Sequence, residues 1–134
     1  MIKTFSYDKT EKLKSKKQLD KIFTGGKSFT VFPLKIFFFL NNEQDNIIKA
    51  GVGVSSRNFK KAVERNRIKR LLREAYRTEK QPLHEYLNKD KKQLALFLLF
   101  IDKELPRYDL LKEKMKMAIQ KLIHQLNEVD IKNT

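Results

Sequence analysis

The sequence predicts one domain of the α+β class, folded as a two-layer α/β sandwich in which helices pack on a sheet. Three apolar stretches rich in Phe, Val, Ile and Leu predict strands over residues 29–40, 48–55 and 93–101. Two longer segments, 59–78 and 106–127, carry apolar residues at helical spacing and predict the main helices. A chain of 134 residues can bury one modest core, and no internal repeat or domain boundary is evident.

The N-terminal part of the chain predicts one short helix after an irregular start. Residues 1–14 are polar and mixed in charge, and we expect them, like residues 128–134, to be loosely ordered. A helix is expected to begin at Ser15, because Ser15 and Gln18 have the spacing of a capping box. Gly25 and the glycine after it would end this helix.

The middle of the chain supplies strands and the breaks between them. The continuous apolar run 36–40 is typical of a strand buried on both faces, and the NNEQDN cluster at 41–46 predicts a turn. We expect the strand at 48–55 to pair antiparallel with the strand before it. Pro82 is expected to stop the helix at 59–78, with a further helical turn at 83–87.

The C-terminal helix has a broad apolar stripe, which favours packing against the core and leaves a weak dimer as the alternative. The stripe consists of Leu110, Leu111, Met115, Ala118, Ile119, Leu122, Ile123 and Leu126.

Positive charge is the strongest functional signal. Lys and Arg outnumber Asp and Glu by 30 to 16, which gives a net charge of +14 and a pI near 10.0. Residues 57–77 hold nine Lys/Arg against two Glu, so this segment carries half of the net charge on a predicted helix. Such a surface favours a polyanionic partner, nucleic acid before anionic membrane.

A helical projection separates this segment into two sides. At 100° per residue, six polar side chains fall within an arc of about 140°. They are Arg65, Asn66, Lys69, Arg70, Arg73 and Arg77. Ile68, Leu71, Leu72 and Ala75 fall on the opposite side, and Arg67 is placed at the flank near the apolar edge. A solvated charged face is the usual explanation of a basic helix. The Arg content argues against it here, because the guanidinium fork matches phosphate oxygens.

Several other classes of function are disfavoured. The chain has no cysteine, which excludes disulfides, thiolate catalysis and cysteine-based zinc sites. The longest apolar run, residues 94–101, is too short to span a bilayer, and no signal peptide is recognised. We therefore expect a soluble cytoplasmic protein. His84 and His124 are far apart in the sequence, and neither paired carboxylates nor a phosphate-binding Gly-rich loop is evident.

The string Ala62–Glu74, AVERNRIKRLLRE, resembles the signature of the bacterial ribonuclease P protein component. In that family a strand ending in Val-Ser leads through a basic loop into this string, and here Val54 and Ser55 precede the segment SRNFKK at 56–61, which contains Arg57, Lys60 and Lys61. The likeness extends to Lys12-Leu13 with the helix after them, and to length, charge and the element order αβββαβα. The resemblance implies a left-handed β-α-β crossover around the basic helix, opposite to the usual hand.

The resemblance also implies a function. Members are protein subunits of ribonuclease P, which bind the catalytic RNA and the 5′ leader of precursor tRNA. They assist Mg²⁺-dependent removal of the leader, which gives the mature 5′ end. The RNA with its bound Mg²⁺ performs the hydrolysis, so the chain would belong to an endoribonuclease without contributing a catalytic side chain. No protein partner would be required.

By the same resemblance, the basic loop and helix would contact the catalytic RNA. The residues concerned are Arg57, Lys60, Lys61, Arg65, Asn66, Arg67, Lys69, Arg70, Arg73 and Arg77. Asn66 could in addition help to hold a hydrated Mg²⁺ beside RNA phosphates, since one amide cannot bind the ion alone.

A cleft between the first helix and the sheet would hold the leader. The candidate residues are Lys12, Leu19, Phe23 and Phe38. Phe23 and an aromatic residue among 37–39, taken as Phe38, would stack on leader bases, with core burial as the alternative for both. Leu19 stands where many members carry Phe, so it would keep an apolar contact without stacking.

Three alternative functions can be weighed against this one. A ribosomal or RNA-assembly protein would use the same basic face without a preference for the leader. A DNA-binding regulator is disfavoured because strands, not a first helix, precede the basic helix. A membrane-surface protein is disfavoured because the basic helix lacks an exposed bulky apolar side.

Overall fold

The computed structural model describes residues 26–41, 48–90 and 93–132. The expected N-terminal helix and residues 1–14 lie outside these ranges. The described elements are β1 (Lys27–Val31), β2 (Leu34–Asn41), β3 (Ile48–Val54), α2 (Ala62–Glu79), α3 (Gln81–Asp90), β4 (Gln93–Phe100) and α4 (Tyr108–Lys132). The α+β class and the sheet-and-helix layers are as predicted.

The four described strands form one mixed sheet in the order β1-β2-β4-β3. β4 pairs antiparallel with β2 and parallel with β3, so that Leu98 lies between Ile36 and Val52. The predicted antiparallel pairing of residues 48–55 with the strand before them is therefore wrong, because β4 lies between the two. The apolar sequence of β4 suits this central position, where both edges of the strand are paired.

The predicted strand over residues 29–40 is two strands. Phe32 and Pro33, joined by a cis peptide bond, form the turn between β1 and β2, which then pair as an antiparallel hairpin. Proline has no N–H for a strand ladder, which is the physical reason for a break at this place. The continuous apolar composition of the segment concealed this turn.

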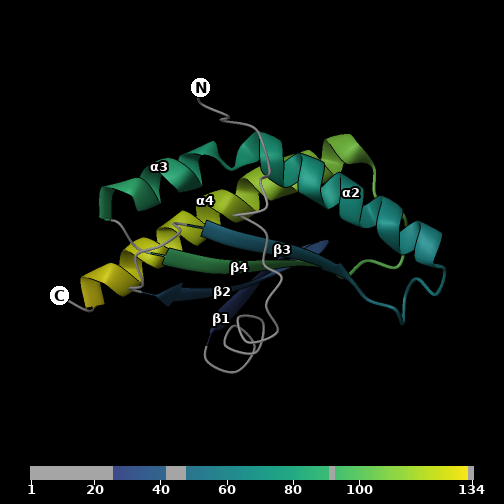
Figure 1. Cartoon of the computed structure of the whole chain (residues 1–134), viewed down its shortest axis with the longest axis horizontal. Coiled ribbons are helices and arrows are strands. Elements are labelled where there is room, and N and C mark those ends of the chain that lie inside the picture. The colour runs from purple at the N-terminus through teal and green to yellow at the C-terminus, as the bar shows by residue number, and fades with distance from the viewer. Residues whose placement is uncertain (1–25, 42–47, 91–92, 133–134) are drawn as a thin grey trace.

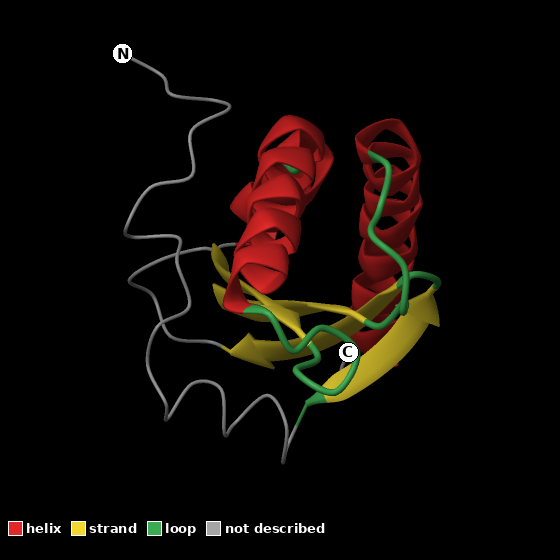
Figure 2. Cartoon of the chain, turned by 90° about the vertical axis from the view of Figure 1, so that its right-hand side faces the viewer, coloured by secondary structure: helices red, strands yellow, loops and turns green. Residues whose placement is uncertain are grey.

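The helices cover one face of the sheet, and α2 lies beside α4 above it (Figure 1, Figure 2). Side chains alternate along β2, so Ile36 and Phe38 face the helices and are buried, while Phe37 and Phe39 point to the other face and are half-buried. The core lies between the sheet and the helices. We call the other side, on which no described helix packs, the open face of the sheet.

Parallel strands β3 and β4 are joined by the two helices α2 and α3, so the β-α-β unit that the resemblance implies is present. Pro82 does not prevent further helix. It lies in the first turn of α3, where its missing N–H costs nothing. The carbonyl of Lys80 accepts hydrogen bonds from the N–H groups of Leu83 (3.0 Å) and His84 (3.1 Å), which starts α3 directly after α2.

The apolar stripe of α4 is used within the molecule. Leu111, Met115, Ala118, Ile119, Leu122 and Leu126 are buried in the core. Ile123 is half-buried and Leu110 is exposed at 49%, and α4 continues to Lys132, five residues beyond the predicted end of this helix at 127. Within the described ranges, no helix has the length and apolar character that crossing a membrane requires.

Candidate nucleic-acid interface

The outer side of α2 presents a row of cations on a rigid helix. Asn66, Arg67, Arg70 and Arg73 are exposed, whereas Ile68, Leu72, Ala75 and Tyr76 are buried. We call these four exposed residues the cationic face. Its three arginines follow one another at intervals of three residues, so they share one side of the helix and a polyanion could contact them together.

The cationic face is rotated from its predicted position. Arg67 was placed at the apolar edge and is exposed, whereas Arg65 and Lys69 were placed on the exposed arc and are half-buried at its flank. The cause is Tyr76, which is 1% exposed and was not counted in the packed side. Tyr76 lies about three turns after Arg65, on the same side of the helix, and its burial turns that side toward the core.

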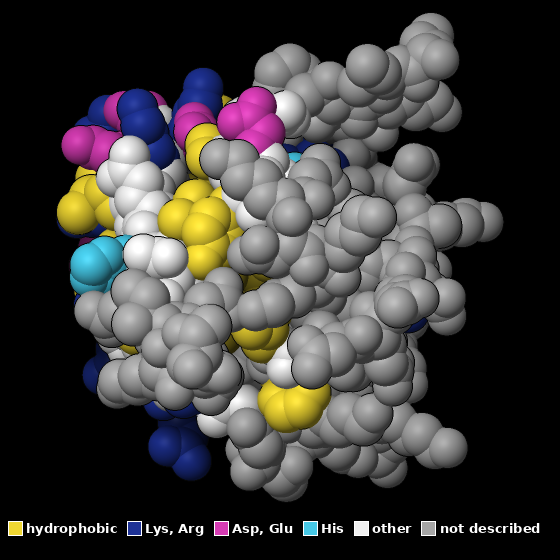
Figure 3. Space-filling view, turned by 90° about the vertical axis from the view of Figure 1, so that its left-hand side faces the viewer, with side chains coloured by type: hydrophobic (Ala, Val, Ile, Leu, Met, Phe, Trp, Pro, Cys, Tyr) yellow, Lys and Arg dark blue, Asp and Glu magenta, His cyan; other side chains and the backbone are white. Residues whose placement is uncertain are grey.

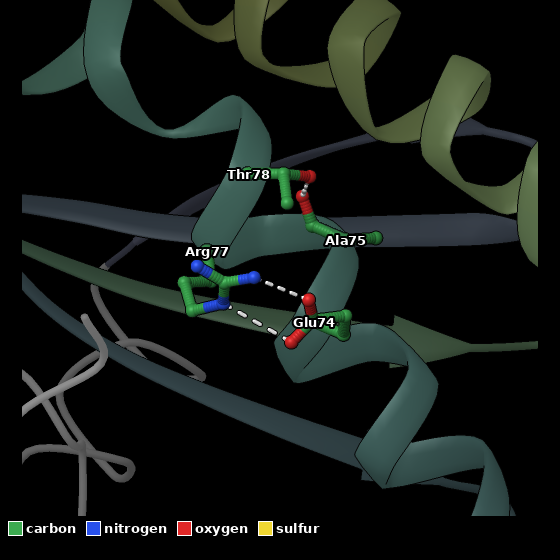
Figure 4. A network of polar contacts seen from close by, with 4 residues as sticks. All are labelled: Glu74, Ala75, Arg77 and Thr78. Atoms are coloured by element: carbon green, nitrogen blue, oxygen red, sulfur yellow. Dashed lines mark hydrogen bonds and ion pairs between the residues drawn. The ribbon is translucent and has the colours of Figure 1, made fainter. Parts of the chain in front are cut away.

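Arg77 differs from the other arginines because it is paired within the helix. Its Nε donates to Glu74 Oε2 at 3.1 Å, and its Nη2 donates to Glu74 Oε1 (Figure 4). The hydrogen bond from Arg77 lowers the pKa of the Glu74 carboxyl, and the carboxylate raises the pKa of Arg77 in turn. Phosphate would have to compete with Glu74 for this guanidinium.

Residues 55–61, which we call the crossover loop, lead from β3 into α2 and are held at several points. The Phe59 ring is 5% exposed and packs against Phe100, with 6.1 Å between ring centroids. The Asn58 side-chain amide donates to the carbonyls of Ile101 (3.3 Å) and Asp102 (3.4 Å). Arg57, Lys60 and Lys61 are exposed on this anchored loop, beside the start of α2.

The end of the molecule opposite the start of α2 carries side chains of mixed charge and polarity. Figure 3 shows that end, where basic, acidic, histidine and hydrophobic side chains of the described residues are intermixed. We call the cationic face and the crossover loop together the positive surface, whose exposed cations are Arg57, Lys60, Lys61, Arg67, Arg70 and Arg73.

The open face of the sheet carries a second group of side chains. Phe37 on β2 pairs in register with Phe97 on β4, and their ring centroids are 6.5 Å apart. Lys35 Nζ lies 5.2 Å from the centroid of the Phe37 ring. A Cβ atom at Gly53 would lie 2.5 Å from Cζ of Phe97, so the Phe97 ring occupies the space that a side chain at position 53 would fill.

Of the four predicted leader-binding residues, Phe38 lies within the described ranges. Phe38 is 3% exposed and packs edge-on against Phe29 at 6.0 Å, so of the two predicted alternatives, base stacking and core burial, the structure shows core burial. The strand alternation decides this, because Phe38 shares the helix-covered face with Ile36. Lys12, Leu19 and Phe23 lie outside the described residues.

The residues described do not form a metal site by themselves. Asn66 is exposed among arginines, and the described ranges hold no group of three or more His, Cys, Asp or Glu side chains that could hold a metal ion. Mg²⁺ prefers oxygen ligands with negative charge, which a single amide beside cations does not supply. The protein side chains present here therefore do not fit Mg²⁺ without an added anionic partner.

Sequence reasoning missed the residues that shape these surfaces. Asn58 and Phe59 anchor the crossover loop through contacts with the end of β4, about forty residues further along the chain, which no local pattern reveals. Phe37 and Phe97 could have been found, since strict alternation along two strands puts alternate aromatic residues on one face. The close approach of Phe97 to Gly53 could be found only once the register of β3 against β4 was known.

Taken together, the sheet, its helical layer and the positive surface define a small α+β protein that presents a cationic helix and an anchored basic loop. Residues 7–123 match the family model of ribonuclease P. The chain is 30% identical to the ribonuclease P protein component of Porphyromonas gingivalis over 131 residues, which cover 97% of this chain and 96% of that protein. The same protein of Chlorobium phaeobacteroides is 30% identical over 132 residues, covering 90% and 88%.

The chain therefore belongs to the family of ribonuclease P protein components. Membership implies a part in a tRNA-processing endoribonuclease complex that includes a ribonuclease P RNA. Solved structures agree on the fold. The RNase P protein of Thermotoga maritima superposes with a TM-score of 0.62 at 23% identity, covering 83% of this chain and 96% of that one. A mutant RNase P protein of Staphylococcus aureus gives 0.65 at 17% identity, covering 85% and 89%.

Proposed function

We propose that this chain is the protein subunit of ribonuclease P, binding the catalytic RNA with its positive surface and the 5′ leader of precursor tRNA with the open face of the sheet. The observation that carries the proposal is the cationic face, since Arg67, Arg70 and Arg73 are exposed on one side of a helix whose other side is buried. Family membership supports ribonuclease P RNA as the polyanion.

The catalytic RNA would be bound by the cationic face and the crossover loop as one surface. Arg57, Lys60 and Lys61 extend the row of charge from the start of α2, and Lys69 lies at its flank. Because both parts are held by packing, little conformational entropy would be lost when phosphates bind. Arg77 would contribute less than the other arginines, because its guanidinium is already bonded to Glu74.

The leader would lie on the open face, over the pair formed by Phe37 and Phe97. Aromatic rings on a strand surface stack on single-stranded bases of any sequence, which suits a leader whose sequence varies among tRNA precursors. Lys35 is near enough to the Phe37 ring to place a positive charge beside a leader phosphate. Phe37 takes the role that the sequence had assigned to Phe38.

The hydrolysis itself is assigned to the RNA and its Mg²⁺. Mg²⁺ would supply charge stabilisation at the scissile phosphate when bound to RNA phosphates. The cationic face would offset the negative charge of RNA strands brought together around that site. Asn66 could contact a water molecule of a metal ion only where RNA phosphates already hold the ion.

A ribosomal or RNA-assembly protein remains the second candidate, because a cationic helix alone does not select one RNA. The proposal is tested by measuring affinity at one salt concentration for a bacterial ribonuclease P RNA and for a ribosomal RNA fragment of equal length. The assembled complex is then tested with precursor and mature tRNA. Preference for ribonuclease P RNA, together with tighter binding of the precursor, is expected.

Equal affinity for the two RNAs would favour the second candidate and contradict the proposal. A preference for ribonuclease P RNA without any preference for the precursor would remove only the leader-binding part. A Phe37→Leu variant serves as a control for that part, because it keeps an apolar side chain on the strand while removing the ring.

A further inference from the structure

Arg65, the first arginine of the R-N-R tripeptide, does not point outward from α2. Its Nη1 donates to two backbone carbonyls of the crossover loop, those of Phe59 (2.8 Å) and Lys60 (2.7 Å). Both distances are typical of hydrogen bonds from a charged donor, which are roughly twice as strong as those between neutral groups. The guanidinium thus reaches back past the start of its own helix.

From this contact we infer that Arg65 is a positioning residue, which fixes the crossover loop so that Lys60 and Lys61 meet the RNA. The inference rests on the proposed function and deepens it. It changes the role that the sequence suggested for Arg65, from a phosphate contact to the residue that shapes a neighbouring contact surface.

The two carbonyl groups that Arg65 holds belong to two planar peptide units on either side of Lys60. The carbonyl of Phe59 belongs to the peptide plane before Lys60, and the carbonyl of Lys60 belongs to the plane after it. Holding both oxygens therefore restrains both dihedral angles of Lys60, and with them the direction of its Cα–Cβ bond. Lys61, which begins at the second of these planes and precedes the first residue of α2, is fixed on one side in the same way.

The first part of the crossover loop is anchored independently, and the carbonyl of Lys61 accepts a hydrogen bond from the backbone N–H of Arg65 at 3.2 Å, so the Arg65 side chain is left to hold the backbone of Lys60. Phe59 is held by the core and Asn58 by the carbonyls at the end of β4. Lys60 and Lys61 are exposed, and Lys61 makes no side-chain cap to the helix. The two hydrogen bonds of Arg65 are the contacts described here that act on the backbone of Lys60.

The test uses the full chain and compares two substitutions that remove the same charge from the same helix. Arg65→Gln shortens the side chain and removes both hydrogen bonds to the loop, whereas Arg70→Gln removes an exposed member of the cationic face. Each is made alone and in a Lys60→Gln/Lys61→Gln background. Affinity for a bacterial ribonuclease P RNA is measured for all of them.

If Arg65 acts through the loop, R65Q should weaken RNA binding about tenfold in the unsubstituted chain and less than about twofold in the lysine-substituted background. R70Q should weaken binding by the same factor in both backgrounds, because it removes an independent phosphate contact. A merely structural loss would not depend on the two lysines. Equal losses for R65Q in the two backgrounds would overturn the inference.

Hydrogen exchange in the free protein gives a readout that needs no RNA. The amide of Phe59, which is bonded to the carbonyl of Ser55 at 3.2 Å, should exchange about tenfold faster in R65Q and at the normal rate in R70Q. Unchanged exchange in R65Q would overturn the inference even if RNA affinity fell. If the unsubstituted protein failed to bind ribonuclease P RNA, the proposed function would be contradicted. Faster exchange in R65Q would in that case still show that Arg65 holds the crossover loop.

Discussion

Replacing Gly53 by Ala tests whether the Phe97 ring is a platform for the leader. The new Cβ would lie 2.5 Å from Cζ and 3.0 Å from Cε1 of Phe97, and 3.4 Å from Cδ1 of Leu99. Carbon atoms pack best at about 3.5–4.0 Å, so the tip of the Phe97 ring has to move by about 1 Å. The ring is half-buried and its Cζ and Cε1 atoms are the far end of a side chain that can rotate, so a shift of the ring can relieve the strain.

The substitution should therefore have two effects of different size, a small one on folding stability and a larger one on leader binding. Relief of the clash should cost about 1 kcal/mol of folding free energy, at the low end for overpacked positions. Loss of one base stacked on Phe97 should cost about 1–3 kcal/mol of leader binding, or roughly tenfold in affinity. Leader binding should thus be affected more strongly than stability, although the substitution adds a single methyl group.

The assay is the ratio of dissociation constants for mature and leader-bearing tRNA, measured with the complex of protein and ribonuclease P RNA, beside a thermal unfolding curve of the protein. Phe97→Ala is the matched control, because Gly53→Ala in that background has no ring to displace. The double variant should equal Phe97→Ala alone. A Gly53→Ala protein that keeps the full preference for the leader would refute the assignment of Phe97, whatever its stability.

Three further predictions concern the positive surface and its support. Arg67→Gln with Arg70→Gln should reduce the slope of log affinity for the RNA against log salt concentration by about 1.5. The control pair, Lys112→Gln with Lys116→Gln on the exposed side of α4, should leave this slope unchanged. Equal slopes for the two double variants would contradict the assignment of the cationic face as the RNA-binding surface. Phe59→Ala should destabilise the fold by about 3 kcal/mol in urea unfolding, because it empties a buried aromatic site beside Phe100; a loss below about 1 kcal/mol would mean that the ring does not anchor the loop. The Glu74–Arg77 pair holds the pKa of Glu74 below its ordinary value of 4.5, so the pair stabilises the fold above pH 4.5 and this stabilisation is lost as the pH falls through the lower folded pKa. The difference in Tm between the unsubstituted chain and Glu74→Gln should therefore vanish on acidification. A difference in Tm that grows on acidification would contradict this sign.

The extent to which the sequence predicts this fold depends on how local the signal is. The helices at 62–79 and 108–132 follow from apolar residues three and four apart, and β4 follows from its composition, so each was predicted within a few residues. The insertion of β4 between β2 and β3 joins segments some forty residues apart, and no local pattern carries that information. The turn at Phe32 and Pro33 was concealed because the flanking residues are apolar on both sides.

In the candidate site, too, the features set by local sequence were predictable and those set by contacts between distant segments were not. That α2 carries a cationic side was predictable from charge and periodicity, and Asn66, Arg70 and Arg73 are exposed as expected. Which cations lie at its centre was not predictable, because the burial of Tyr76 turns the helix and brings Arg67 outward. The position of Arg65 depends on where the crossover loop passes, and that path is set by the contacts of Asn58 and Phe59 with the end of β4.

The central claim is that this chain assists a catalytic RNA in removing the leader of precursor tRNA. The most direct measurement is single-turnover cleavage of a precursor tRNA by a bacterial ribonuclease P RNA at a low Mg²⁺ concentration, with and without the protein. Cleavage should be slow without the protein and at least about tenfold faster with it, and Arg67→Gln with Arg70→Gln should reverse most of the gain. An unchanged rate at protein concentrations that saturate the RNA would contradict the account.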